Sequence, residues 1–146
     1  MDASKETILL VDGHEDDVLL FEDALRRSHL DNPVSVVQSG QEAMDYLSGS
    51  GPYADCLRYP LPAVIVLELA LMPGDGFELL TWIRTQPHLK WILLVVLTNS
   101  IWPKELELAR KLGADHVFSK PGGCEDLRTV VNLLRDQHSK GVSMDS

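Results

Sequence analysis

The sequence is poor in cysteine, has no excess of basic residues and contains no long apolar run. Its 2 cysteines, Cys56 and Cys124, do not have the spacing of metal ligands. We interpret them as free thiols in a reducing cytoplasm, and a disulfide is the alternative that we favour less. The formal net charge of −9 argues against nucleic acid and against an anionic membrane surface as partners, because both attract clustered Lys and Arg.

Targeting and membrane-spanning patterns are also missing. No apolar run approaches the ~20 residues that a membrane-spanning helix needs. The opening stretch MDASKETILLV lacks the basic region and the long apolar region of a secretory signal. We therefore expect a cytoplasmic protein that does not associate with a membrane.

The 146 residues, of which 45% are hydrophobic, fit one domain with one core. We assign this domain to residues 1–138 and interpret 139–146 as a polar tail. Short apolar runs alternate with stretches of helical periodicity. The expected strands are 8–11, 34–37, 63–67, 92–97 and 116–119. Three of them are almost wholly apolar, which is typical of parallel strands buried on both faces. The pattern therefore predicts an α/β fold with a doubly wound, five-stranded parallel sheet.

Local signals mark the connections. Ser39 and Glu42 form an S-x-x-E capping box, which predicts the start of a helix. Pro103 suits the first position of a later helix, and Gly113 suits the residue after it. The segment 48–62 is rich in Gly and Pro and predicts a long loop rather than a domain boundary.

Polar residues follow four of the expected strands. They are Asp12-Gly13 after the first strand, Glu68 after the third, Thr98-Asn99 after the fourth and Lys120-Pro121 after the fifth. In sheets of this kind, ligands bind outside the carboxyl ends of the strands, near the point where the strand order reverses. We therefore expect two carboxylates, a hydroxyl and an ammonium group to converge on one edge.

These positions resemble the receiver domain of two-component response regulators. The stretches ILLVDGHEDDVLLF and LDNPVSVVQSGQEAMDYLSGSGPYAD are similar to the small single-domain regulators that accompany bacterial phytochromes. Further matches to the family are Asp75-Gly76-Phe77, Gly113-Ala114 and Lys120-Pro121. The resemblance extends from about Thr7 to Leu134, and it implies a receiver domain with the flavodoxin-like strand order 2-1-3-4-5.

The resemblance implies a role in a phosphorelay. In receivers, a histidine kinase transfers a phosphoryl group to an aspartate at the end of the third strand. A magnesium ion is held by an acidic pair after the first strand, by the acceptor and by a backbone carbonyl, which Ala70 would supply here. A Ser or Thr after the fourth strand and a Lys after the fifth contact the phosphoryl oxygens. Thr98 and Lys120 occupy these two positions.

Four positions depart from the receiver pattern. Glu68 replaces the acceptor aspartate, and Gly13 replaces the second acid of the pair, so that Asp12 stands alone. Val117 replaces the aromatic residue whose rotamer change remodels the output face, and Asn99 replaces a smaller residue. Two carboxylates facing one lysine attract a divalent ion less than three do, and Gly13 offers no side-chain oxygen. We therefore expect weak or absent Mg²⁺ binding and no required cofactor.

The extra methylene of Glu68 lengthens its reach by about 1.5 Å. An error of about 1 Å in positioning can slow phosphoryl transfer about a hundredfold. We hypothesise that Glu68 forms a partly buried ion pair with Lys120, reaches toward Thr98 and imitates the charge of a phosphorylated aspartate.

Neighbouring residues have simpler interpretations. Asp12 can accept hydrogen bonds from backbone N–H groups of the next turn instead of binding a metal, and Gly13 can serve a tight turn. His14 has no partner at ligand spacing and is interpreted as a surface residue. The acidic run Glu15–Asp17 is expected to stabilise the N-terminus of a helix. Trp102 is a candidate for an exposed contact near the start of the fourth helix.

The function that we expect is that of a pseudo-receiver, a receiver module without an output domain that signals through protein–protein interaction. Its partner would be a sensor histidine kinase or a downstream signalling protein. We also expect a homodimer interface on the face of the helix that begins at Pro103, strand 116–119 and the helix with apolar face 127–134. We do not expect an enzyme.

Three alternatives stay open. The first is a functional phosphoacceptor that a histidine kinase phosphorylates. The second, more remote, is a small-molecule enzyme or flavin-binding protein on a similar fold, although no Gly-rich phosphate loop follows the first strand. The third is an engineered or damaged variant of a normal receiver.

Overall fold

The computed structural model describes residues 7–27, 29–71, 75–98 and 102–119. In this part of the chain the strands are β1 (Ile8–Val11), β2 (Val34–Val37), β3 (Val64–Leu67), β4 (Leu93–Thr98) and β5 (His116–Ser119). All neighbouring strands are parallel, and the order is β2-β1-β3-β4-β5. The predicted parallel sheet and its strand order are therefore confirmed.

Three strands have the predicted bounds, and two differ slightly. β3 begins at Val64, one residue later than predicted. β4 is shifted by one residue at each end, because the Ile92 N–H bonds within the preceding turn and Thr98 still pairs with Ser119 on β5.

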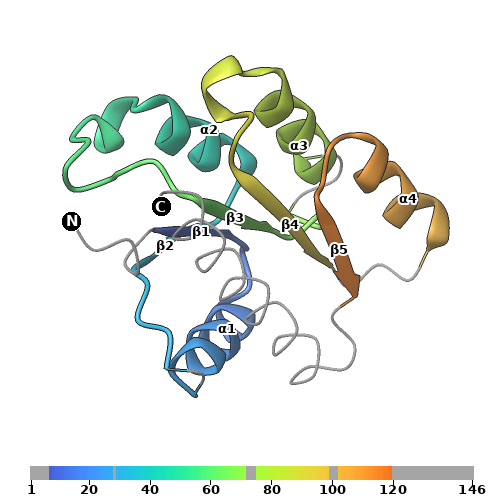
Figure 1. The fold of residues 1–146 in the computed structure, drawn as a ribbon, viewed down its shortest axis with the longest axis horizontal. Helices are drawn as coiled ribbons and strands as arrows, with labels where there is room; N and C mark the ends of the chain where they lie inside the picture. Colours follow the sequence, from blue (N-terminus) through green and yellow to red (C-terminus); the bar gives the residue numbers. More distant parts are fainter. Residues whose placement is uncertain (1–6, 28, 72–74, 99–101, 120–146) are drawn as a thin grey trace, which may run out of the picture.

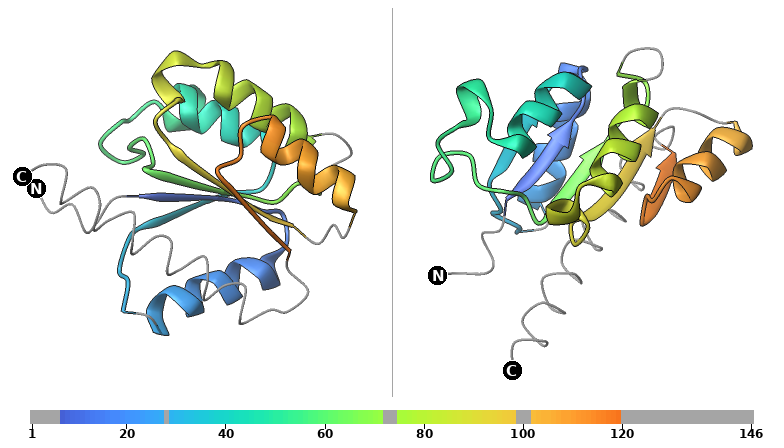
Figure 2. Two further views of the ribbon diagram at one scale, coloured as in Figure 1. Left: turned by 45° about the vertical axis from the view of Figure 1, so that its right-hand side comes forward. Right: turned by 90° about the horizontal axis from the view of Figure 1, so that it is seen from above.

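Helices cover both faces of the sheet (Figures 1 and 2). α1 (Glu15–Arg27) lies on one face, and α2 (Gly40–Ser48), α3 (Asp75–Thr85) and α4 (Pro103–Lys111) lie on the other. Two short 3-10 helices, η2 (Gly51–Tyr53) and η3 (Pro87–Leu89), lie in the connections. Within the described residues, no helix is long and apolar enough to cross a membrane.

Alternate residues of β1 point into two hydrophobic clusters. Leu9 and Val11 belong to the cluster that contains side chains of α2, α3 and α4. Ile8 and Leu10 pack instead with Phe21 and Leu25 of α1. Because both faces are covered, every residue of β1 is buried. This double burial explains why the strand is a continuous apolar run rather than an alternating one.

The predicted signals at the helix ends are present. The Glu42 N–H donates to Ser39 Oγ at 3.1 Å, and Ser39 is the N-cap of α2. Pro103 is the first residue of α4. Gly113 follows the C-terminal end of α4 with a φ of 120°, and a Cβ there would lie 2.5 Å from Arg84 Cγ. Both the backbone conformation and the close approach of Arg84 therefore favour glycine.

The segment predicted as a long loop packs on an aromatic cluster. The rings of Tyr46 and Tyr53 lie 5.2 Å apart, and those of Tyr53 and Tyr59 lie 5.0 Å apart, measured between centroids. The Tyr46 hydroxyl donates to the Pro60 carbonyl at 2.9 Å and lies 3.1 Å from the Ser35 hydroxyl. Burial raises the pKa of Tyr46 above its ordinary value of 10.0. The cluster ties this loop to α2 and to the edge strand β2.

Cys56 lies in the same loop as a free, exposed thiol, in agreement with our interpretation of that residue. Several predictions fall outside the described residues. They concern Cys124, Asn99, Lys120-Pro121, the helical face 127–134 and the tail 139–146.

Candidate functional site

Three of the predicted site residues lie at the carboxyl edge of the sheet. Val11 of β1 pairs with Leu67 of β3, so Asp12 and Glu68 follow neighbouring strands at the same level. Thr98 is the last residue of β4, the next strand in the sheet. The exposed fractions of Asp12, Glu68 and Thr98 are 3%, 2% and 0%. These polar side chains are therefore held in a dry environment, where hydrogen bonds and charges act strongly.

Glu68 is bonded both to its own turn and to the next strand. The Thr98 hydroxyl donates to Glu68 Oε1 at 2.9 Å. The backbone N–H of Ala70 donates to the same oxygen at 2.9 Å. Oε2 is also buried. Because burial removes water from a carboxylate, donors of this kind are needed to stabilise it. The predicted reach of Glu68 toward Thr98 is confirmed.

The ion pair between Glu68 and Lys120 stays a prediction, because Lys120 lies outside the described residues. Asn99, which replaces a smaller residue of the receiver pattern, also lies outside the described residues. Ala70 was predicted to offer its carbonyl to a metal ion. Its N–H is committed to Glu68, and the role of its carbonyl also stays a prediction.

Asp12 is bonded to the turn that follows it. Its Oδ1 accepts the backbone N–H of His14 at 2.9 Å, and it lies 3.1 Å from the ring Nδ1 of His14. The Asp12 N–H in turn donates to the Val37 carbonyl of β2. The structural interpretation of Asp12, as an acceptor for the next turn, is therefore confirmed. Its role in metal binding stays a prediction.

Our interpretation of His14 needs a correction. His14 is a surface residue as expected, with 58% of its side chain exposed. It nevertheless has partners at ligand spacing, because Nδ1 lies 3.1 Å from Asp12 and 3.9 Å from Asp17 Oδ2. The missed signal was the D-x-H-x-x-D pattern across a strand end and the first turn of a helix. A helix that begins at Glu15 brings the third residue of this pattern back toward the first two.

Gly13 is not held by an unusual backbone conformation. Its φ lies outside the left-handed region that favours glycine, so the turn does not depend on glycine as we had proposed. A Cβ at this position would lie 3.3 Å from the Gln38 carbonyl oxygen. A side chain at position 13 would thus require a shift of a few tenths of an ångström between this Cβ and the Gln38 carbonyl.

The remaining predictions concern elements next to the site. Val117 is partly buried and packs against the cluster on the α2–α4 face of the sheet. The acids Glu15–Asp17 form the first turn of α1, as predicted. Trp102 is 67% exposed directly before α4, also as predicted. An exposed aromatic of this size is suited to contact a partner.

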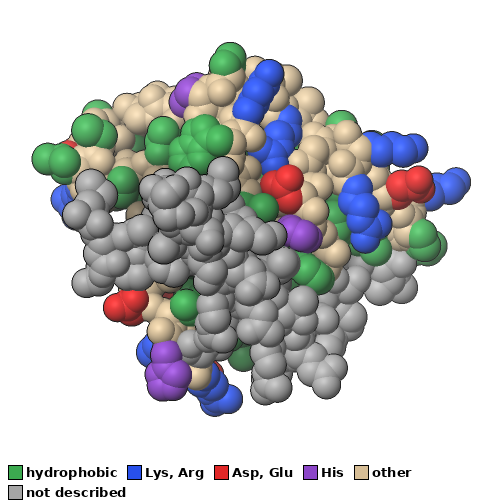
Figure 3. Space-filling view, in the orientation of Figure 1, with side chains coloured by type: hydrophobic (Ala, Val, Ile, Leu, Met, Phe, Trp, Pro, Cys, Tyr) green, Lys and Arg blue, Asp and Glu red, His purple; other side chains and the backbone are tan. Residues whose placement is uncertain are grey.

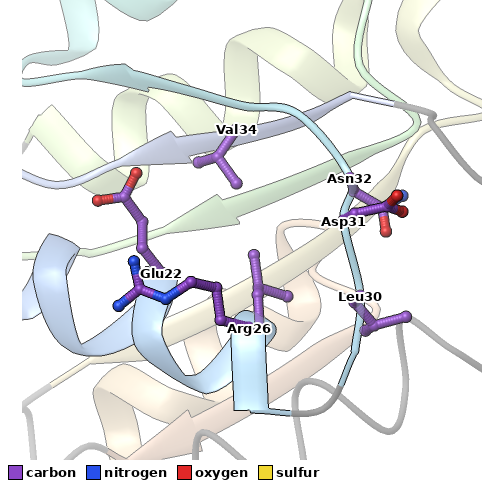
Figure 4. A pocket seen from close by; sticks show the side chains of 7 residues that line it. Glu22, Arg26, Leu30, Asp31, Asn32 and Val34 are labelled. Atoms are coloured by element: carbon purple, nitrogen blue, oxygen red, sulfur yellow. The ribbon is translucent and has the colours of Figure 1, made fainter.

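A hollow of about 260 Å³ lies elsewhere, between the C-terminal half of α1 and the connection to β2 (Figure 4). Its walls include Glu22 and Arg26 from α1 and Asp31 and Asn32 from the connection. These connecting residues precede β2, so the hollow lies at the amino edge of the parallel sheet, opposite Glu68. It is therefore separate from the candidate site.

The surface near α4 carries both signs of charge. In Figure 3 Lys and Arg side chains lie beside Asp and Glu side chains over this helix. One such pair joins Lys111 and Glu107, whose charged atoms lie 3.9 Å apart. Both side chains are well exposed, so the pair adds little stability.

The fold and the edge residues can now be compared with known proteins. Residues 8–132 match the family model described as the response regulator receiver domain. This match covers most of the chain. The chain belongs to the response regulator receiver family. The predicted family and fold are thereby confirmed, and the match favours a signalling role over the small-molecule enzyme that we considered.

Individual receivers support this assignment. The chain is 32% identical over 126 residues to the response regulator Rcp1 of Synechocystis sp., covering 86% of this chain and 84% of Rcp1. The crystal structure of the phosphorylated cyanobacterial phytochrome response regulator RcpA has a TM-score of 0.78 at 32% identity, with 90% and 91% of the two chains covered. The Mn²⁺-bound form of Rcp1 has a TM-score of 0.76 at 32% identity, with 86% and 88% covered. The predicted closeness to phytochrome-associated regulators is confirmed.

Proposed function

We propose that this receiver is a pseudo-receiver, which signals in a two-component pathway by binding other proteins and not by accepting a phosphoryl group. Membership of the family places it in two-component signalling. The finer proposal depends on Glu68 and Gly13, the two positions that differ from the pattern of phosphorylated receivers.

The observation that carries the proposal is the hydrogen bonding of Glu68. Its Oε1 accepts both the Thr98 hydroxyl and the Ala70 N–H at 2.9 Å. Thr98 occupies the position whose hydroxyl is expected to contact a phosphoryl oxygen. Glu68 therefore engages, without any kinase, a donor that a phosphoryl group would otherwise use. The bond ties the end of β3 to the end of β4, which leads toward α4.

The oxygen atoms available as metal ligands at this edge are also a poor fit for magnesium. Mg²⁺ requires near-octahedral oxygens at about 2.0–2.1 Å. Gly13 supplies no side-chain oxygen, and Oε1 of Glu68 already accepts two hydrogen bonds. Use of this Glu68 oxygen as a metal ligand would compete with these two hydrogen bonds. This is why the proposal includes weak or absent Mg²⁺ binding and no required cofactor.

The second candidate is a functional phosphoacceptor. It is favoured by two relatives, since RcpA is described as phosphorylated and Rcp1 as Mn²⁺-bound. It is also favoured by the burial of Asp12 and Thr98 at the expected edge. Glu is a competent nucleophile in other proteins, so geometry and charge decide between the two candidates.

The proposed partner is a sensor histidine kinase or a downstream signalling protein, and the proposed activity is binding without catalysis. The exposed Trp102 beside α4 is the side chain that we would place at such an interface. A homodimer through α4, β5 and the segment that follows is part of the same proposal. Cytoplasmic location and the absence of nucleic-acid binding also stay proposals.

The two candidates differ in a labelling experiment. The protein is incubated with labelled acetyl phosphate and Mg²⁺, and covalent label is counted. We expect no label on the natural protein and label on the double variant Gly13→Asp, Glu68→Asp. The single variants serve as matched controls for each position. Magnesium-dependent labelling of the natural protein would overturn the pseudo-receiver proposal.

A further inference from the structure

Asp12, His14 and Asp17 form a cluster at the N-terminal end of α1. Asp12 follows β1, His14 lies in the short connection, and Asp17 lies in the first turn of the helix. One possible metal-ligand atom from each side chain lies within 4.8 Å of the other two. Among the described residues, this is the group of three His, Cys, Asp or Glu side chains that are close enough to share a metal ion. Only Asp12 is shared with the edge site around Glu68.

The separations agree with a common metal ion. Ligands at about 2.1 Å from a metal lie about 3.0 Å apart in adjacent octahedral positions and about 3.4 Å apart in a tetrahedron. Nδ1 of His14 lies 3.1 Å from Asp12 Oδ1 and 3.9 Å from Asp17 Oδ2. The first separation already fits, and the second must shorten; the third, between Asp12 and Asp17, lies within 4.8 Å. The Asp17 side chain is partly exposed, at 29%.

The three side chains differ in burial in a way that suits an open site. The Asp12 side chain is 4% exposed and is fixed by the His14 N–H, so it is a rigid anchor. The His14 side chain is 58% exposed, which leaves the solvent side free for entry of an ion and for water ligands.

The ligand set indicates the class of metal. Imidazole nitrogen suits Zn²⁺, Co²⁺, Ni²⁺ and Cu²⁺, whereas Mg²⁺ prefers oxygen ligands. One nitrogen and two carboxylates with open positions are typical of a borderline divalent ion. This makes the cluster chemically different from the acidic set that holds magnesium in receivers, and it also distinguishes the cluster from a group of surface acids.

We propose that Asp12, His14 and Asp17 bind a divalent transition-metal ion, with Zn²⁺ as the expected occupant and water in the remaining positions. The proposal is independent of whether Glu68 accepts a phosphoryl group. Because Asp12 would be a ligand, the ion would hold the β1–α1 connection against the edge that contains Glu68.

The test titrates the full-length protein with Co²⁺, followed by its visible absorption, and then displaces Co²⁺ with Zn²⁺; Mg²⁺ is titrated separately. We expect saturable binding of one Co²⁺ per chain, displacement by Zn²⁺, and binding of Mg²⁺ at least a hundredfold weaker.

His14→Ala and Asp17→Asn should each weaken Co²⁺ binding at least tenfold. The matched controls His88→Ala and Asp16→Asn, which change an exposed imidazole and an exposed acid outside the cluster, should change it less than twofold.

Three outcomes would overturn the proposal: no saturable binding, binding that survives His14→Ala, or equal losses in Asp16→Asn and Asp17→Asn, which would indicate general attraction to an acidic turn. Circular dichroism confirms that each variant is folded. Labelling of the Gly13→Asp, Glu68→Asp variant reports on the phosphoacceptor proposal separately, so failure of one does not imply failure of the other.

Discussion

The ends of β1 and β3 carry one buried carboxylate each, yet the two acids bond in different directions. Asp12 bonds within the β1–α1 connection, where its Oδ1 accepts the His14 N–H and lies near the His14 imidazole. Glu68 reaches across the sheet to Thr98 as well as into its own turn at Ala70. The longer side chain joins two strands, whereas the shorter one stabilises a local turn.

This difference has a consequence for signalling. A bond between β3 and β4 restrains the start of the connection to α4, where Trp102 is exposed. The bonds from Asp12 to His14 lie within the β1–α1 connection. We therefore expect substitutions at the Glu68 end to affect both stability and the surface near α4, and substitutions at the Asp12 end to have mainly local effects.

Breaking the bond between strands should have the largest effect. Thr98→Val keeps the shape of a fully buried side chain but removes the donor to Glu68 Oε1. We expect the free energy of unfolding to fall by about 2 kcal/mol, because a buried charged acceptor loses one donor. Urea denaturation measures this loss. Thr81→Val is the matched control, since the exposed Thr81 hydroxyl bonds only within α3, and its loss should stay below about 0.5 kcal/mol.

A double-mutant cycle between Glu68→Leu, which removes the acceptor, and Thr98→Val, which removes the donor, measures the coupling directly. We expect an interaction energy of about 1–2 kcal/mol, because the two side chains are in direct contact. The same cycle between Glu68→Leu and Thr81→Val should give a coupling near zero. Equal coupling in both cycles would show that the bond between Glu68 and Thr98 contributes nothing specific.

The hydrogen bonds of the neutral Tyr46 hydroxyl give a reference value for these losses in the free energy of unfolding. Tyr46→Phe removes the bonds to Pro60 and Ser35 and should lower the free energy of unfolding by about 1 kcal/mol. It also has a pH dependence. Burial raises the pKa of Tyr46 above 10.0, so above that pH the unfolded chain loses its proton first, and stability falls as pH rises. The Phe variant should lose part of this alkaline decline, as followed by denaturation between about pH 8 and 11.

The smallest effect is expected at the other acid. In Asp12→Asn the remaining carbonyl oxygen can still accept the His14 N–H, and the imidazole contact is largely exposed. We expect a change below about 0.5 kcal/mol in metal-free buffer, measured by the same urea denaturation. A loss as large as that of Thr98→Val would contradict the distinction between the two ends of the sheet.

The fold was predictable because the strands are short apolar runs and because Gly and Pro mark the connections. Glu68 and Thr98 were also predictable as neighbours, since parallel strands place their carboxyl ends on one edge. The partners of His14 were not predicted, because they depend on the helix beginning at Glu15 and turning Asp17 back toward Asp12. The contact between the Ala70 N–H and Glu68 was missed for a similar reason. It depends on how the chain turns after β3, which no residue spacing specifies.

The most direct test uses beryllofluoride, which stands in for the phosphoryl group. It is titrated with Mg²⁺ into the natural protein and into the Gly13→Asp, Glu68→Asp variant, while tryptophan fluorescence and heat are followed. If Glu68 takes the place of the phosphoryl group, the natural protein shows no saturable binding and the double variant gains it. Saturable, magnesium-dependent binding to the natural protein would contradict this interpretation and would indicate a working phosphoacceptor.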